Sequence, residues 1–195
     1  DFANGSFAPA PNRITLYVAS PTENFLGART ESWLKAVFTH ELTHYVHLTD
    51  PRGLFGTISR FVGEFAQLLN WPFMPGWMVE GITTDRETAY TEGGRGRSVP
   101  FEMTYKAPIL EDRLFSLAQA AYMSDYPPSG RIYVAGNMLV RYLNETYGDD
   151  TFARIYRRFI DFPLLGPWGA IKHVTGKSGT ELFEEMKTHY RHKFA

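Results

Sequence analysis

Three of the six histidines in this 195-residue chain fall within eight consecutive positions, at His40, His44 and His47. Apolar residues recur at helical spacing from 33 to 46 and are followed by Asp50-Pro51, so we predict a helix that ends there. Four residues of helix place His40 and His44 about 40° apart on one face and about 6 Å apart along the axis. Two imidazoles at that spacing can converge on one metal ion, so we expect a fold built around this helix.

The composition limits what else could hold such an ion. The chain contains no cysteine, which excludes disulfides, iron–sulfur clusters and thiolate zinc sites and leaves His, Asp and Glu as ligands. The formal net charge is −1 and the charges are scattered, so we expect no nucleic-acid partner. The chain is 44% hydrophobic, which predicts a folded globular protein. It has no transmembrane segment, because no apolar run approaches the ~18–20 residues that span a bilayer.

The residue after the first histidine of the pair offers a general base. Glu41 follows His40 directly and therefore lies one step round the predicted helix from it. From that position its carboxylate can take a proton from a metal-bound water without being a ligand itself. The pattern His40-Glu41-Leu-Thr-His44 therefore predicts a hydrolytic metal site.

A catalytic zinc needs a third protein ligand and an open position for water or substrate. Two carboxylates compete for the ligand position. Glu80 lies thirty-six residues after His44, on a second predicted helix that could pack across the first. Asp50 lies six residues after His44, where another class of zinc protease places its third ligand after a glycine turn. Here the turn position holds His47, which tolerates a positive φ poorly, so we favour Glu80.

The remaining pattern predicts an α+β fold, with a small N-terminal sheet and a mainly helical second half. Residues 1–12 predict an irregular lead-in, and 13–19 alternate as a strand that could form the upper edge of a cleft. The amphipathic segment 54–69 predicts a core helix, which is favoured over a helix on a membrane surface because its polar face is not especially basic. The glycine-rich segment 91–100 predicts a loop. We expect an N-cap near Thr30 for the histidine helix, and further helices at 77–90, 110–122, 131–147, 149–161 and 178–192.

The length predicts a single domain over 1–195, since no repeat or shift in composition divides the chain. Residues 1–75 would form a lobe with the strand and the histidine helix, and 76–195 a helical lobe. The sequence begins at Asp1 without a basic and apolar leader. We therefore expect a mature protein or a piece excised from a longer chain.

Two motifs together resemble the gluzincin zinc metallopeptidases, in particular their aminopeptidase N-like branch. His40-Glu41-Leu-Thr-His44 matches the H-E-x-x-H motif of that branch, and Trp77-Met-Val-Glu80-Gly81 matches its W-x-x-E-G motif. A third segment, Tyr133-Val-Ala-Gly136, is similar to the Y-x-x-G segment that follows them. In that branch an acidic residue often stands seven positions after the third ligand, which here is Glu87.

The resemblance implies a zincin-like fold and one zinc ion held by His40, His44 and Glu80. It implies that Glu41 is the general base and that the hydroxyl of Tyr133 hydrogen-bonds the developing oxyanion. Glu87 returns to nearly the same helix face as Glu80, so it either supports the site from behind a ligand or is an ordinary solvated glutamate.

The implied activity is hydrolysis of peptide bonds in a peptide or protein substrate. The branch carries a G-x-M-E-N segment that holds the substrate's amino group, and residues 1–39 contain nothing like it, which favours an endopeptidase over an aminopeptidase. The whole chain most resembles the peptidase-like domain of bacterial exported proteins that also carry a β-propeller, which implies a periplasmic or extracellular location. Two alternatives remain: a catalytically weak or inactive peptide-binding module, and a metzincin-like hydrolase with Asp50 as third ligand.

Several charged residues and histidines receive no firm role. His47 is expected at the surface or beside the site, not on the metal. Arg95 and Arg97 could meet a substrate carboxylate, but a solvated loop is favoured. The remaining histidines are placed at the surface: His173, His189 and His192.

Overall fold

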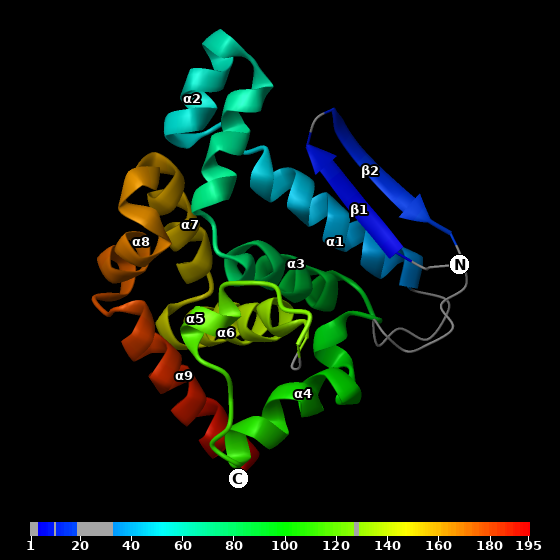
Figure 1. Ribbon diagram of the computed structural model, residues 1–195, viewed down its shortest axis with the longest axis vertical. Helices are drawn as coiled ribbons and strands as arrows, with labels where there is room; N and C mark the ends of the chain where they lie inside the picture. Colours follow the sequence, from blue (N-terminus) through cyan, green and yellow to red (C-terminus); the bar gives the residue numbers. More distant parts are fainter. Residues whose placement is uncertain (1–3, 10, 19–32, 127–128) are drawn as a thin grey trace.

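The computed structural model describes residues 4–9, 11–18, 33–126 and 129–195. It shows a two-stranded antiparallel sheet at the N-terminus followed by helices, which confirms the α+β class (Figure 1). The expected N-cap at Thr30 and the end of the predicted strand at Ala19 lie outside the described residues. Among the described residues no helix is long and apolar enough to cross a membrane.

The N-terminal sheet is a hairpin of β1 (Asn4–Pro9) and β2 (Asn12–Tyr17), with Asn4 opposite Tyr17 and Pro9 opposite Asn12. The expectation of an irregular lead-in is therefore wrong for residues 4–9. The strand β1 has weak strand propensity, but it lies along helix α1 (Trp33–Leu48) (Figure 1). A Cβ on Gly5 would lie 2.5 Å from Val37 Cγ1, so glycine permits this close approach.

Helix α3 (Gly76–Tyr90) lies against α1, and helix α6 (Arg131–Tyr147) lies against α3. All three helices were predicted. Helices α3 and α6 touch through their backbones, since a Cβ on Gly81 would lie 2.5 Å from the carbonyl carbon of Gly136. The main hydrophobic core surrounds this pair and contains the fully buried Trp77 and Met138.

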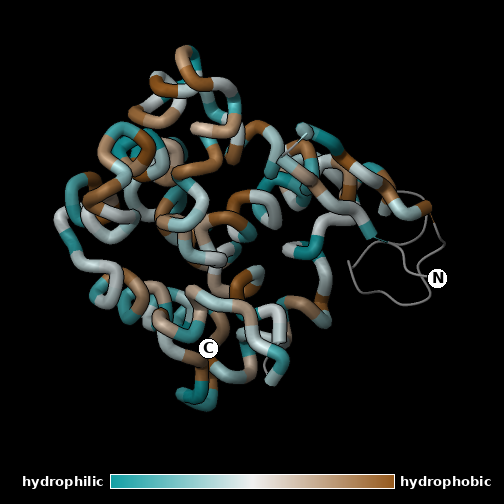
Figure 2. The backbone as a smooth tube through the Cα atoms, turned by 45° about the horizontal axis from the view of Figure 1, so that its top comes forward, coloured by the Kyte–Doolittle hydropathy of each residue, from teal (hydrophilic) through white to brown (hydrophobic). Residues whose placement is uncertain are grey.

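The segment predicted as one core helix over 54–69 is instead broken into α2 (Gly53–Val62) and the 3₁₀ helix η1 (Glu64–Phe73). The break falls at Gly63, which has a φ of 97° that other residues rarely adopt. Both pieces project from the body of the molecule (Figure 1), and Figure 2 shows hydrophobic stretches along them. Phe61 is 86% exposed, so the core-helix reading is wrong.

The second half is helical, but between residues 91 and 122 it differs from the sequence pattern in two places. The predicted loop over 91–100 contains the 3₁₀ turn η2 (Arg95–Arg97) and the start of α4 (Val99–Leu110), and the helix expected at 110–122 is reduced to α5 (Leu117–Ala120). Ser98 caps α4, because its side-chain oxygen accepts a hydrogen bond from the backbone N–H of Phe101. Pro100 lies in the first turn of α4, where the helix needs no backbone N–H from it.

The C-terminal helices pack around α6 and complete the core. Helices α7 (Thr151–Asp161) and α9 (Gly179–Phe194) match the prediction within three residues at each end. Between them lie the 3₁₀ turn η3 (Pro163–Leu165) and α8 (Gly166–Thr175). Sequence analysis missed α8, because Pro167 indicates a break although it occupies the first helical turn.

Candidate metal centre

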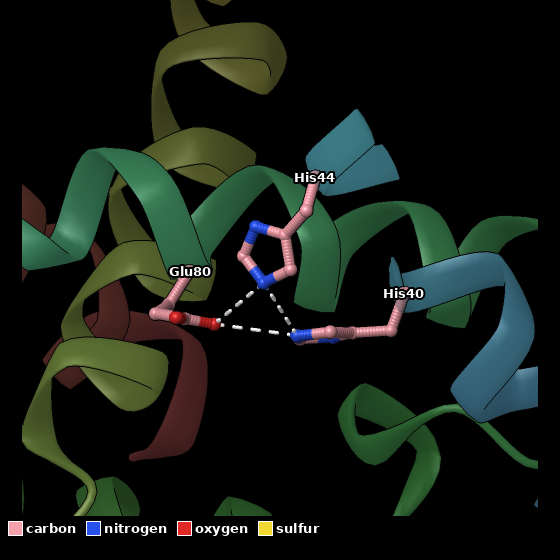
Figure 3. A group of neighbouring side chains, drawn as sticks. All are labelled: His40, His44 and Glu80. Carbon is pink, nitrogen blue, oxygen red and sulfur yellow. Dashed lines mark hydrogen bonds and ion pairs between the residues drawn. The ribbon is translucent and has the colours of Figure 1, made fainter. Parts of the chain in front are cut away.

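Three side chains from two helices converge at the centre of the molecule. His40 and His44 come from α1 and Glu80 from α3 (Figure 3). The two Nε2 atoms lie 3.1 Å apart, and Glu80 Oε2 lies 3.3 Å from His40 Nε2 and 3.4 Å from His44 Nε2. Each residue therefore offers one ligand atom to a common point, and the group could hold a metal ion.

Two of these three distances match those between the ligands of a tetrahedral ion, and the distance between the two nitrogens is slightly shorter. Bonds of about 2.0–2.2 Å to nitrogen and oxygen place the ligand atoms of a tetrahedral zinc about 3.3–3.5 Å apart. The buried Glu80 Oε2 also has no hydrogen-bond partner among the described residues. A buried carboxylate oxygen without a donor is costly, and a cation between the three atoms would satisfy it.

His40 and Glu80 of this cluster shift each other's pKa. Burial alone would raise the pKa of Glu80, but the adjacent imidazoles of His40 and His44 lower it overall. Burial alone would lower the pKa of His40, but Glu80 and Glu87 raise it overall. The site therefore favours a positive charge at its centre, and a metal ion would compete there with a proton.

Glu87 holds His40 from the side opposite the metal position. Its Oε2 lies 2.9 Å from His40 Nδ1, and its side chain is 2% exposed. This excludes an ordinary solvated glutamate at this position. A proton on Nδ1 that is donated to Glu87 leaves the Nε2 lone pair facing Glu80 and His44, which is the tautomer that a metal ligand requires.

Arg95 in turn holds Glu87. Its Nε and its backbone N–H each lie 3.0 Å from Glu87 Oε1, and its side chain is 12% exposed. The expectation of a solvated loop is therefore wrong for Arg95. The signal was present in the glycines beside it: Gly94 and Gly96 approach Thr88 so closely that a Cβ at either position would lie within 3.0 Å of Thr88 atoms. Arg97 donates to the backbone oxygens of Thr88 and Thr91.

Glu41 lies on the flank of α1 that faces β1. Its side chain is buried beside Gly5, whose missing Cβ would otherwise lie 2.8 Å from Glu41 Cγ. Burial raises the pKa of the Glu41 carboxyl above its ordinary value, whereas His40, His44 and the Phe7 backbone lower it in part. A carboxylate with a raised pKa is suited to accept and return a proton.

Tyr133 reaches the site from α6. Its ring centre lies 6.3 Å from that of His40, and the guanidinium of Arg95 stacks 4.5 Å from the centre of the Tyr133 ring. Burial and the nearby Glu80 raise the pKa of Tyr133 to about 12, although Arg95 opposes them. The phenol therefore stays protonated near neutral pH and remains a hydrogen-bond donor.

Asp50 and His47 lie away from the three ligand atoms. Both carboxylate oxygens of Asp50 accept hydrogen bonds from Arg52, including Nε to Oδ1 at 2.8 Å, and Asp50 does not belong to the ligand group. His47 is buried, which rules out a surface position. Its ring centre lies 4.2 Å from that of Tyr156, whose hydroxyl donates to the His47 carbonyl.

The other histidines lie far from this cluster. His173 and His192 are exposed, as expected. His189 is half-buried beside Glu145, at 3.6 Å, so the surface expectation is only partly right for it.

Comparison with known proteins shows one distant similarity. The chain is 27% identical over 161 residues to an uncharacterised protein of Treponema pallidum (strain Nichols). The match covers 80% of this chain but 13% of that protein, so the chain spans a small part of its relative's length. No family model and no solved structure matches the chain. The function is therefore inferred from the chemistry of the site.

Proposed function

We propose that this chain is a zinc-dependent peptidase domain of the gluzincin type, with a zincin-like fold. The observation that carries the proposal is the His40, His44 and Glu80 group, whose ligand atoms have nearly the spacing of a tetrahedral zinc. Two nitrogens and one carboxylate oxygen leave one position open, as catalytic zinc sites require. Glu87 contacts His40 from the side away from the ligand atoms, and Glu41 follows His40 in the sequence. These two carboxylates support a hydrolytic site over a site that only stores metal.

Zinc bound in this group would polarise a carbonyl and lower the pKa of a bound water toward neutrality. The residues supply the proton transfers. Glu41 accepts the proton from the attacking water and then passes it to the leaving amine, which one carboxylate with a raised pKa can do in both steps. Tyr133, protonated and held by Arg95, donates a hydrogen bond to the developing oxyanion.

The hairpin offers a place for an extended peptide. The strand nearest Glu41 is β1, not the strand predicted at 13–19, because Gly5 and Phe7 lie against the Glu41 side chain. Within the described residues β1 pairs with β2 alone. A substrate could therefore add along the other edge of β1 and pass over the metal. This arrangement suits an internal segment of a protein, so we propose an endopeptidase.

The wider context is part of the proposal and rests on the sequence resemblance alone. We propose that the domain belongs to a longer exported protein that also carries a β-propeller. The Treponema relative is a longer protein, since the chain spans 13% of it. The domains of that relative can be compared with the proposed arrangement.

Glu41→Gln tests the chemistry separately from the metal. Zinc-loaded wild-type protein should cleave a mixed set of unstructured peptides, and a chelator should abolish cleavage. The variant should lose at least about 100-fold in rate, because general acid–base catalysis contributes about 10²–10⁴-fold. Its zinc content should equal that of the wild type.

A conservative change elsewhere on α1 is the matched control: Lys35→Gln alters an exposed side chain and should leave the rate unchanged. If zinc-loaded wild-type protein cleaves no peptide in a broad set yet binds some of them, the peptide-binding module is correct and the peptidase proposal fails.

A further inference from the structure

A cavity lies on the other side of α1 from Glu41. It has a volume of about 380 Å³ and is lined by residues of α1, α3 and α7. Thr39 and Thr43 line it, and each lies two residues from Glu41, about 160° round the helix. The cavity therefore lies on the face of α1 away from Glu41 and β1. Its volume falls in the usual range for small-molecule sites, about 300–1,000 Å³.

A buried polar group without a partner forms part of its wall. His47 lines the cavity and is 6% exposed, and neither ring nitrogen has a hydrogen-bond partner among the described residues. Phe152 and Tyr156 flank the ring, so apolar surfaces surround it. A neutral imidazole has one N–H donor and one acceptor, and leaving both unpaired in a buried position is unfavourable. A ligand with a polar end would satisfy them.

The cavity also contains a cation that can reach a ligand. Arg86 on α3 lines it and is 35% exposed; its closest acidic contact is its own neighbour Asp85, at 3.6 Å. The second arginine of the wall, Arg52, is already occupied by both oxygens of Asp50. Arg86 is therefore the wall cation that a new anion would meet.

The rest of the wall favours an apolar body with one negative charge. Leu42, Val46 and Ile82 supply aliphatic surface. Two acidic residues also line the cavity: Asp50 is paired with Arg52, and Asp149 disfavours more than one negative charge on a ligand. A single carboxylate near Arg86 or His47, attached to an aliphatic or aromatic body, complements both features.

We propose that the cavity between α1, α3 and α7 binds a small organic monocarboxylate, with its apolar body against Leu42, Val46 and Ile82. Arg86 pairs with the carboxylate, and His47 donates a hydrogen bond to the ligand. The site is separate from the metal centre, so it stands whether or not the chain is a peptidase.

Calorimetric titration with 4-phenylbutyrate tests the site, with 4-phenylbutanamide as the uncharged comparison. The acid should bind one site per chain, and the amide should bind at least about tenfold more weakly, because it cannot pair with Arg86. Arg86→Gln should weaken binding of the acid at least about tenfold and leave binding of the amide unchanged. Val46→Trp should abolish binding of both by filling the cavity.

Arg60→Gln is the matched control, since Arg60 is an exposed arginine on α2 that does not line the cavity. It should bind 4-phenylbutyrate as the wild type does. Zinc content and melting temperature of every variant should match the wild type, which separates loss of the site from loss of the fold. Absence of binding to wild-type protein at millimolar ligand, or equal binding of acid and amide, would overturn the proposal.

Discussion

At the scale of single residues, the candidate metal centre depends on a chain of contacts that begins away from the ligands. Arg95 holds Glu87 by two contacts of 3.0 Å, and Glu87 holds His40 at 2.9 Å. Burial would raise the pKa of Glu87, but Arg95 and His40 lower it overall, so the carboxylate stays charged. A charged partner fixes the orientation of His40 and increases its basicity toward a metal.

Removal of the Glu87 charge should weaken binding of the metal without removing a ligand. Glu87→Gln should lower zinc affinity about 10–100-fold, the usual effect of losing such a partner. Competition with a fluorescent chelator measures the change. Glu92→Gln, an exposed glutamate on the same stretch of chain, should bind zinc as the wild type does. Equal zinc affinity of Glu87→Gln and wild type would contradict the role of Glu87.

A second prediction at this scale concerns His47 and acid stability. Burial lowers the pKa of His47 from 6.5 to about 3, so the folded protein keeps it neutral while the unfolded chain can protonate it. Between pH 6.5 and 3 the unfolded state therefore binds the extra proton, and stability falls as the pH falls, by up to about 1.4 kcal/mol per pH unit from this group.

His47→Gln removes this titration. In urea unfolding of the metal-free protein, the free energy of unfolding of the variant should depend less steeply on pH than that of the wild type between pH 6.5 and 4. Above pH 7 the two pH profiles should run parallel. Identical slopes in the acid range would show that His47 is protonated in the folded protein.

At the scale of elements, the position of Glu80 depends on how closely α3 approaches α6. Gly81 follows Glu80 directly, and a Cβ on Gly136 would lie 2.5 Å from Gly81 Cα. The close contact fixes α3 between α1, which carries the histidines, and α6, which carries Tyr133. Two glycines at the crossing therefore connect the ligands to the proposed oxyanion donor.

Gly136→Ala should push these helices apart. We expect the free energy of unfolding to fall by about 1–3 kcal/mol, as for other overpacked cores, and zinc affinity to fall with it. Gly169→Ala on α8 is the control: its Cβ would first meet Leu165 Cβ, at 3.1 Å, and its stability should stay within about 1 kcal/mol of the wild type. Chemical denaturation of both variants gives the comparison.

The elements that sequence predicted well are those whose signal is local. Helices α1 and α6 have long apolar periodicity, and α3 lies between Pro75 and the glycine-rich segment 91–100. Each lies where the pattern places it. Strand β1 was missed because its residues form a strand only through pairing with β2 and packing on α1. Helices α4 and α8 were missed because Pro100 and Pro167 indicate breaks but stand in first helical turns.

The same division applies to the site. Helical spacing alone places His40 and His44 side by side, and the resemblance singles out Glu80. The contact of Arg95 with Glu87 lies in a turn whose sequence signal is its glycines, and glycines allow a close approach without predicting it, so the burial of Arg95 required the structure. The cavity beside His47 is lined by residues from three helices, and no local sequence pattern predicts which residues meet there.

At the scale of the whole molecule, the candidate metal position is formed by residues of both predicted lobes, 1–75 and 76–195. The histidines come from the first 75 residues and Glu80 from the rest, and one main core extends from Leu48 to Tyr190. Because the unfolded chain cannot present this arrangement, a metal ion bound there would add directly to the stability of the fold.

Removal of zinc should therefore lower the melting temperature. Free zinc at about 1,000 times its Kd stabilises the folded state by about 4 kcal/mol, which corresponds to roughly 10 °C for a domain of this size. Thermal unfolding with zinc and with excess chelator measures the difference. The melting temperature of Glu80→Ala should change little with zinc or with chelator. A shift as large as that of the wild type would contradict the proposed ligand set.

The most direct test of the account is the metal content of three purified proteins, measured by elemental analysis after zinc loading and dialysis. We predict one zinc per chain in the wild type and in Asp50→Ala, whose carboxylate is bound to Arg52. We predict loss of zinc in Glu80→Ala, which removes the third ligand. Retention of zinc in Glu80→Ala together with its loss in Asp50→Ala would contradict the proposed centre.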